Sequence, residues 1–119
     1  MKSKPPVGIS LRLDLADGIR LGPGKADVLQ GIKETGSIAG AGRELGMSYK
    51  RVWGIVEELN GMFDAPLVEA AKGGKAGGGA GLTRLGQAVL AAYRRVEAET
   101  VRAAMRELTQ LRRRLAKDR

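Results

Sequence analysis

Four neighbouring side chains, Ser48, Tyr49, Lys50 and Arg51, have the chemistry to bind a nucleic acid. Ser48 is a good N-cap for a helix that we expect to run to about Met62, and the free backbone N–H groups of its first turn favour phosphate. Tyr49 can offer a hydroxyl to a phosphate or a ring face to a sugar or a thymine methyl group, while Lys50 or Arg51 can donate to guanine O6 and N7. Each residue alone is also compatible with a helix cap or a solvated surface, so the surrounding elements have to decide.

A second basic segment, AKGGKAGGGAGLTR, holds six glycines between Gly73 and Gly81. We expect short strands at residues 67–70 and 81–83 to flank a glycine-rich wing over residues 71–82. Its charge comes from Lys72, Lys75 and Arg84. Glycines let backbone N–H groups approach a phosphate chain, and each lysine that neutralises a phosphate releases counterions. The segment is not a P-loop, because Ala76 stands where Ser or Thr must follow Gly-Lys. A flexible linker without function stays open as the alternative.

The elements before these residues are a hairpin and a helix. Alternation of apolar and polar residues over 9–16 indicates a strand with one buried face. Asp17-Gly18 is a strong two-residue turn signal, so residues 19–21 can return as the second strand. A helix from Pro23 to Thr35 should follow, because proline suits the first turn of a helix and Gly36 suits its end.

Two further helices are spaced as a helix-turn-helix. Ser37 is a good N-cap for a short helix over residues 38–45, whose alanines and glycines permit close approach to a neighbouring helix. Gly46 ends it, and the helix after Ser48 has an apolar stripe that we expect to be buried. Trp53 lies beside this stripe, and we expect it to anchor the helix against the rest of the domain. In such a motif the second helix enters the DNA major groove with its N-terminal residues toward the bases.

The remainder, from residue 85 onward, has apolar residues at steps of three or four and predicts one long helix. At 1.5 Å per residue it would be about 45 Å long and would overhang so small a domain. The outer part of its apolar seam has nothing within the chain to bury it, so we predict a homodimer. The dimerisation residues would be Val96, Thr100, Ala104, Leu108, Leu111 and Leu115. Three successive steps of four between Val96 and Leu108 resemble a stutter, which would unwind a coiled coil locally.

Charge and composition narrow the classes of function. The chain has 119 residues, enough for one domain, and a formal net charge of +8, which points to a polyanionic partner. It has no cysteine and no histidine, which excludes disulfides, thiolate chemistry, the usual zinc sites and histidine-based catalysis. Because no paired carboxylates or nucleophile and base can be named, we expect no enzyme, no metal and no other cofactor. No stretch reaches the ~20 apolar residues of a membrane span, so we expect a cytoplasmic protein without a membrane partner.

Two long segments, TGSIAGAGRELGMSYKRVWGIVEELN and LVEAAKGGKAGGGAGLTRLGQAVL, together resemble the amino-terminal DNA-binding domain of the ModE family, the molybdate-responsive bacterial transcription regulators. The resemblance covers residues 23–93, and a more distant similarity connects the chain to the LysR-type winged helix. It implies a dimer and DNA contacts from residues 48–51, from Lys72 and Lys75, and from Thr83 and Arg84. Full-length members continue into oxyanion-binding domains that sense molybdate, whereas this sequence stops at Arg119, so we assign no small-molecule effector.

The sequence therefore predicts a mainly α fold with a small β-hairpin: a winged helix-turn-helix over residues 1–84 and a long C-terminal dimerisation helix over residues 85–119. We expect the homodimer to bind double-stranded DNA in a sequence-specific way, with the helix over residues 48–62 in the major groove. Phosphate contacts would come from the wing and from the helix caps, Ser37 and Ser48. The alternatives are an architectural DNA-binding protein that ignores sequence and a protein-interaction module that uses the long helix.

Overall fold

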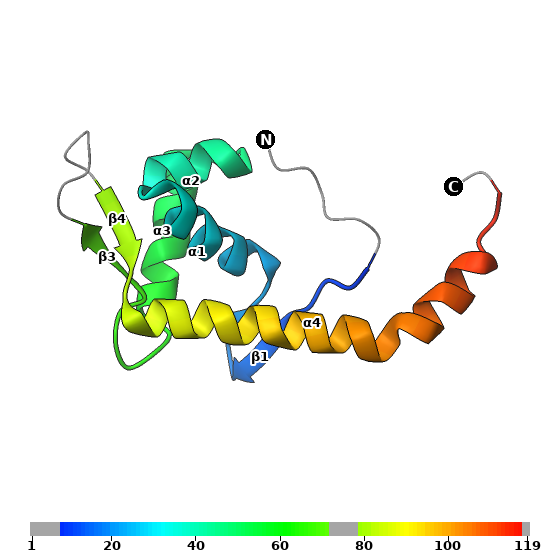
Figure 1. Ribbon diagram of the computed structural model, residues 1–119. Coiled ribbons are helices and arrows are strands. Elements are labelled where there is room, and N and C mark those ends of the chain that lie inside the picture. The colour runs from blue at the N-terminus through cyan, green and yellow to red at the C-terminus, as the bar shows by residue number, and fades with distance from the viewer. Residues whose placement is uncertain (1–7, 72–78, 118–119) are drawn as a thin grey trace.

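The computed structural model describes residues 8–71 and 79–117, and Figure 1 shows the arrangement of the helices and strands. The first hairpin pairs β1 (Leu13–Ala16) with β2 (Ile19–Leu21) in antiparallel fashion. Gly18 has a φ of 77° in the turn, a left-handed conformation that glycine adopts without steric cost. The predicted first strand was too long, because β2 offers only three residues to pair and residues 9–12 lie outside the ladder.

Three helices follow, and apart from the end of the third their boundaries are those that the capping residues predicted. Helix α1 (Pro23–Thr35) ends at Gly36, and α2 (Ile38–Leu45) ends at Gly46; both glycines have positive φ. Helix α3 (Tyr49–Asn60) begins after Ser48 as expected. It ends two residues before the predicted Met62, since the chain turns at Gly61, whose N–H donates to the Glu58 carbonyl at 3.1 Å.

Helices α1 and α2 approach each other closely through small residues, as predicted. A Cβ atom added to Gly31 would lie 3.0 Å from the Cβ of Ala41, and one added to Gly42 would lie 2.9 Å from the carbonyl oxygen of Met47. Both distances are shorter than real Cβ contacts allow without movement. The packing of α1 on α2 and the tight turn after α2 therefore both depend on glycine at these positions.

The second hairpin forms the wing and pairs β3 (Val68–Ala71) with β4 (Gly79–Leu82). Its base is pinned to α3 by Asn60, whose side-chain oxygen accepts from the N–H groups of Leu67 at 2.8 Å and Val68 at 3.0 Å. The N–H of Ala80 also donates to the carbonyl of Gly36 at 2.9 Å. The wing thus has a defined position relative to both α1 and α3.

Helix α4 (Arg84–Arg113) joins the core through its first turns, where Gly86, Leu90 and Tyr93 are buried. Its later turns extend beyond the other helices (Figure 1), and the molecule measures 52 × 31 × 21 Å. We had expected this helix to continue to the end of the chain; instead it stops at Arg113, so Leu115 lies beyond it. Within the described residues, α4 and the other helices are too short or too polar to cross a membrane.

Candidate nucleic-acid interface

The first turn of α3 carries the predicted base and phosphate contacts at the surface. Tyr49 is 55% exposed, and Ser48, Lys50 and Arg51 are exposed as well. The Ser48 hydroxyl oxygen accepts from the N–H of Arg51 at 3.1 Å, which leaves the hydroxyl proton available to a phosphate. Ser37 caps α2 in the same way by accepting from Gly40 N–H at 2.8 Å. Each serine hydroxyl can therefore accept a hydrogen bond from its own helix and donate its proton to a phosphate at the same time.

The helical period distributes the exposed residues of α3 over three directions. With about 100° between successive residues, the side opposite the buried valines carries Lys50 and Gly54. One flank carries Tyr49 and Trp53. The other flank carries Arg51 and points toward α1, as shown by Glu58 on that side, whose Oε2 lies 3.7 Å from Nζ of Lys25 at the start of α1. The two cationic side chains of the first turn thus leave the helix in different directions.

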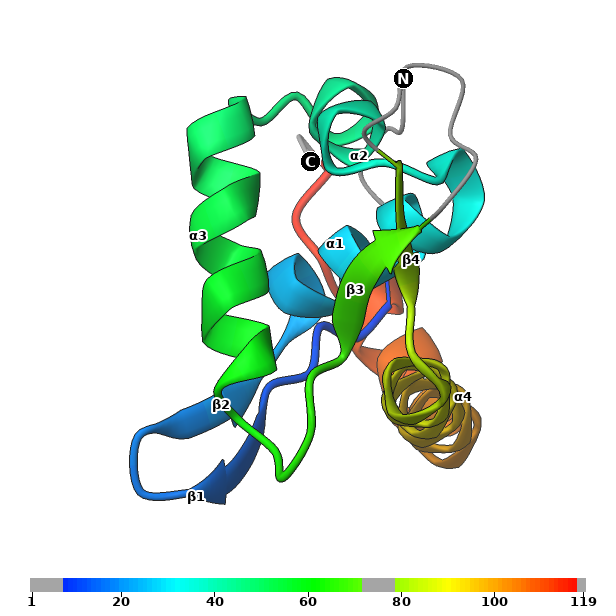
Figure 2. The same ribbon diagram turned by 90° about the vertical axis from the view of Figure 1, so that its left-hand side faces the viewer.

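The flank with Tyr49 and Trp53 faces the wing across a groove. Figure 2 shows α3 beside the hairpin of β3 and β4, with the N-terminal end of α3, the C-terminal end of β3 and the N-terminal end of β4 all directed away from α4. The groove between them has a volume of about 260 Å³. Its walls come from the start of α2, from Tyr49, Trp53 and Val56, and from Val68, Ala70 and Ala80 of the wing. Helix α3 and the wing therefore share one face, as a duplex laid across both would require.

The expected anchoring role of Trp53 was wrong. Its side chain is 43% exposed, whereas Val52 and Val56 on the same helix are fully buried. The core side of α3 is filled by these smaller residues, so the indole is left at the rim of the groove. The helical period indicates this position, because Trp53 stands one turn after Tyr49, on the flank beside the buried stripe and not within it.

Comparison with known proteins identifies the family. The family described as "Bacterial regulatory helix-turn-helix protein, lysR family" matches residues 25–87, which run from the start of α1 through the wing into α4. The chain belongs to this family. The match confirms the predicted fold class, a mainly helical winged helix-turn-helix with a small hairpin and a long C-terminal helix.

Relatives with curated names agree with the lysR-family assignment and with the resemblance to ModE proteins. The chain is 42% identical over 101 residues to the molybdenum-pterin-binding protein MopA of Rhodobacter capsulatus, covering 85% of this chain and 38% of that protein. It is 40% identical over 85 residues to the DNA-binding transcriptional dual regulator ModE of Escherichia coli K12, covering 71% of this chain and 32% of that protein. The chain thus spans about a third of the length of these relatives, and neither name describes an enzyme.

The predicted site residues in the wing of this lysR-family chain differ in what they can contribute to DNA binding. The Thr83 hydroxyl accepts from Gly86 N–H at 2.9 Å and donates to the Pro66 carbonyl at 2.8 Å, so its only proton is already used. Arg84 next to it is exposed. Lys72 and Lys75, the predicted cationic tip, lie outside the described residues. Of the predicted wing residues that the structure describes, Thr83 therefore fixes the end of β4 and Arg84 supplies the positive charge.

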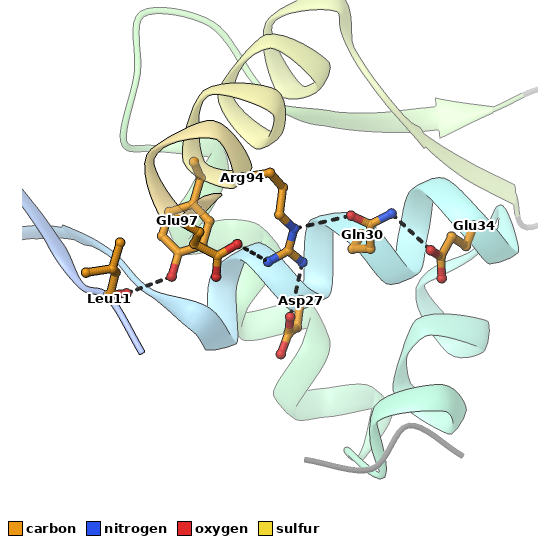
Figure 3. A network of polar contacts seen from close by, with 7 residues as sticks. Leu11, Asp27, Gln30, Glu34, Arg94 and Glu97 are labelled. Atoms are coloured by element: carbon orange, nitrogen blue, oxygen red, sulfur yellow. Dashed lines mark hydrogen bonds and ion pairs between the residues drawn. The ribbon is translucent and has the colours of Figure 1, made fainter. Parts of the chain in front are cut away.

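A polar cluster around Arg94, which sequence reasoning missed, joins α4 to α1 (Figure 3). The guanidinium lies 3.3 Å from Oδ1 of Asp27 and 3.0 Å from Oε1 of Glu97, and its Nε donates to Gln30 at 3.5 Å. Partial burial would lower the pKa of Arg94, but the bonds to Glu97 and Asp27 outweigh it and raise the pKa. The cluster therefore ties α4 to α1 through charged and polar side chains.

The next residue, Tyr93, fixes the N-terminal segment to the same helix. Its hydroxyl donates to the carbonyl of Leu11 at 2.6 Å, which explains why residues 9–12 follow α4 instead of extending β1. The ring is 1% exposed. Burial, together with the charge of Glu97, raises the pKa of Tyr93.

The predicted dimerisation residues fall into two groups. Val96, Leu111 and Leu115 are exposed, at 39%, 67% and 57%, whereas Thr100, Ala104 and Leu108 are partly covered within one chain. Met105 on the same part of α4 is 54% exposed. The outer half of α4 thus offers an apolar surface, although Leu115 is not on the helix. Among the described residues, no group of three or more acidic side chains could hold a metal ion.

Proposed function

We propose that the chain is a transcription regulator that binds double-stranded DNA in a sequence-specific way as a homodimer. The family assignment supports DNA binding, and the relative from Escherichia coli is named as a DNA-binding transcriptional regulator. Because the chain covers about a third of that relative, the molybdenum in the names of other relatives is not carried over to it. The lysR-family match, over residues 25–87, includes the helix-turn-helix.

In this proposal α3 enters the major groove, which is about 12 Å wide and admits one helix. Lys50 leaves the outermost side of α3 and Arg51 the flank toward α1, so the two would read bases at different positions along the groove. Tyr49, together with the capping hydroxyls of Ser37 and Ser48, would contact phosphate or sugar. These groups fix the register of the helix on the duplex.

The wing and the long helix complete the proposal. The wing, with Lys72, Lys75 and Arg84, would follow the adjacent phosphate backbone, while Thr83 holds its base in place. Two copies that pair along the outer half of α4 would place two recognition helices about 34–36 Å apart, one turn of the DNA helix. A near-palindromic site would then be read by both.

The observation that carries this proposal is the shared face of the exposed first turn of α3 and the wing, with the groove between them. To test it, duplexes are selected from a randomised library by the full chain, and their binding is compared with that of random duplex by fluorescence anisotropy. Arg51→Ala should cost about 1–3 kcal/mol on selected duplex and relax the preference at one base pair. Arg20→Ala is the control, since this exposed arginine lies on β2, away from α3's first turn.

Two results would contradict the proposal. Equal losses on selected and random duplex for Arg51→Ala would remove this residue from base reading and favour an architectural DNA-binding protein. A library that yields no enriched sequence, with the folded chain confirmed by circular dichroism, would reject sequence-specific binding.

A further inference from the structure

The indole of Trp53 is only partly covered by the described residues of the chain. A tryptophan that serves packing is normally covered, because its large apolar surface is costly to leave in water. Trp53 is instead 43% exposed at the rim of the groove, one turn from Tyr49, which is 55% exposed. Two aromatic side chains on one flank of α3 thus form an apolar surface that the described residues cover only in part.

The residue next to Trp53 points to a partner that comes close. Gly54 lies in the interior of α3, where glycine costs about 1 kcal/mol relative to alanine. A Cβ atom added there would meet no atom within 4 Å, so internal packing does not require the glycine. The glycines of α2, in contrast, are surrounded by neighbouring atoms. A bare backbone on the outer side of α3 permits the close approach of something outside the chain.

The chemistry of the groove selects the part of the partner that fits. Its walls are mainly aliphatic and aromatic, and the acidic side chain among them, Glu69, would repel a phosphate. Lys50 and Arg51 lie in the N-terminal turn of the same helix, where their positive charges attract a polyanion as a whole. The fitting partner is therefore anionic overall but presents an uncharged apolar group at this point. In the major groove, the thymine C5-methyl group meets this description, and no other base carries it.

We propose that Trp53 is a specificity-determining residue that packs its indole on a thymine methyl group in the major groove. The inference rests on the proposed function, DNA binding through α3, and extends the reading surface from the first turn of the helix to its second. Gly54 lets the backbone approach the bases far enough for the indole to reach. Tyr49 keeps its phosphate or sugar contact at the outer end of the same flank.

The experiment uses the full chain and a duplex selected from a randomised library. Each thymine of that duplex is replaced in turn by uracil, which removes only the methyl group, and binding is followed by anisotropy of a labelled strand. At one position per half-site the wild type should lose about fourfold in affinity, the equivalent of one buried methyl group. Trp53→Ser should bind more weakly and show no such loss at that position. Leu15→Ser is the matched control: Leu15 is 49% exposed but lies on β1, and this variant should give the wild-type scan.

Trp53 is the single tryptophan of the chain, so its fluorescence reports on the contact directly. Bound duplex should protect Trp53 from acrylamide quenching, and the protection should be equal in the wild type and in Leu15→Ser. If the duplex binds but Trp53 stays as accessible as before, or if the scans of wild type and Trp53→Ser coincide, the inference is wrong while the proposed function stands. If the wild type binds no duplex at all, both are wrong.

Discussion

Replacing Gly54 by alanine should make the chain more stable and a weaker DNA binder. Alanine is the better helix former by about 1 kcal/mol in an exposed helix interior. Position 54 lies in the middle of α3, and an added Cβ atom has no neighbour within 4 Å, so no clash reduces this gain. A gain of this size should raise the midpoint of thermal unfolding by about 4 °C.

The loss in DNA binding follows from where the methyl group would stand. Lys50 and Gly54 lie one turn apart on the side of α3 that faces away from the core. A methyl group on this side would hold the helix away from the base edges and disturb the contact proposed for Lys50. We expect a loss of about 1–3 kcal/mol on selected duplex, the value of one good base contact. Random duplex, held mainly through phosphate, should lose much less.

Thermal unfolding and anisotropy titration on the same preparations measure the two effects. Gly24→Ala is the matched control, because Gly24 is also helical and exposed and also has no atom within 4 Å of an added Cβ atom, but it lies in the first turn of α1. This variant should leave DNA affinity unchanged. If Gly54→Ala binds selected duplex as tightly as Gly24→Ala does, the second turn of α3 does not approach the bases and the reasoning fails.

The remaining predictions concern packing, pH and assembly. Gly31→Ala should destabilise the chain by about 1–3 kcal/mol in urea unfolding, since its Cβ atom would lie 3.0 Å from that of Ala41; an unchanged midpoint would show that α1 and α2 can separate freely. Tyr93→Phe should cost about 1 kcal/mol through the lost bond to Leu11. Because the pKa of Tyr93 is raised in the folded state, its contribution to the free energy of unfolding is complete below about pH 10 and is lost as the pH rises through the folded pKa. The urea midpoint of the wild type should therefore fall at alkaline pH by more than that of Tyr93→Phe. Leu111→Lys should convert dimers to monomers in sedimentation equilibrium and weaken binding to a palindromic duplex more than to a half-site; dimers of undiminished stability would exclude this surface.

The local signals of the sequence predicted the helices well. The ends of these helices are marked by Pro23, Gly36, Ser37, Gly46 and Ser48. Each of these residues acts through hydrogen bonds or backbone angles within a few positions of itself. Such signals do not depend on the rest of the fold. The limits of α1, α2 and the start of α3 could therefore be predicted from sequence, and with them the helix-turn-helix that positions the candidate site.

Contacts between distant residues could not be predicted in the same way. The extended strand over residues 9–16 was too long because Tyr93, more than eighty positions later, binds the carbonyl of Leu11. The Arg94 cluster brings together side chains of α1 and α4 that no local pattern connects. Both depend on the angle at which α4 crosses the body, which is set by packing of the whole core.

Trp53 shows why residue type alone misleads at a binding face. A large apolar side chain beside a buried stripe is expected to be buried, since burial lowers its free energy. In α3 the core is already filled by Val52, Val56 and Leu59, all at most 1% exposed, so a fourth and larger side chain on the neighbouring flank finds no room. Its position is therefore costly for the isolated chain. That cost is recovered if a partner covers the indole. An exposed tryptophan on α3 is therefore better evidence for a contact than the adjacent lysine and arginine, whose charges are stable in water.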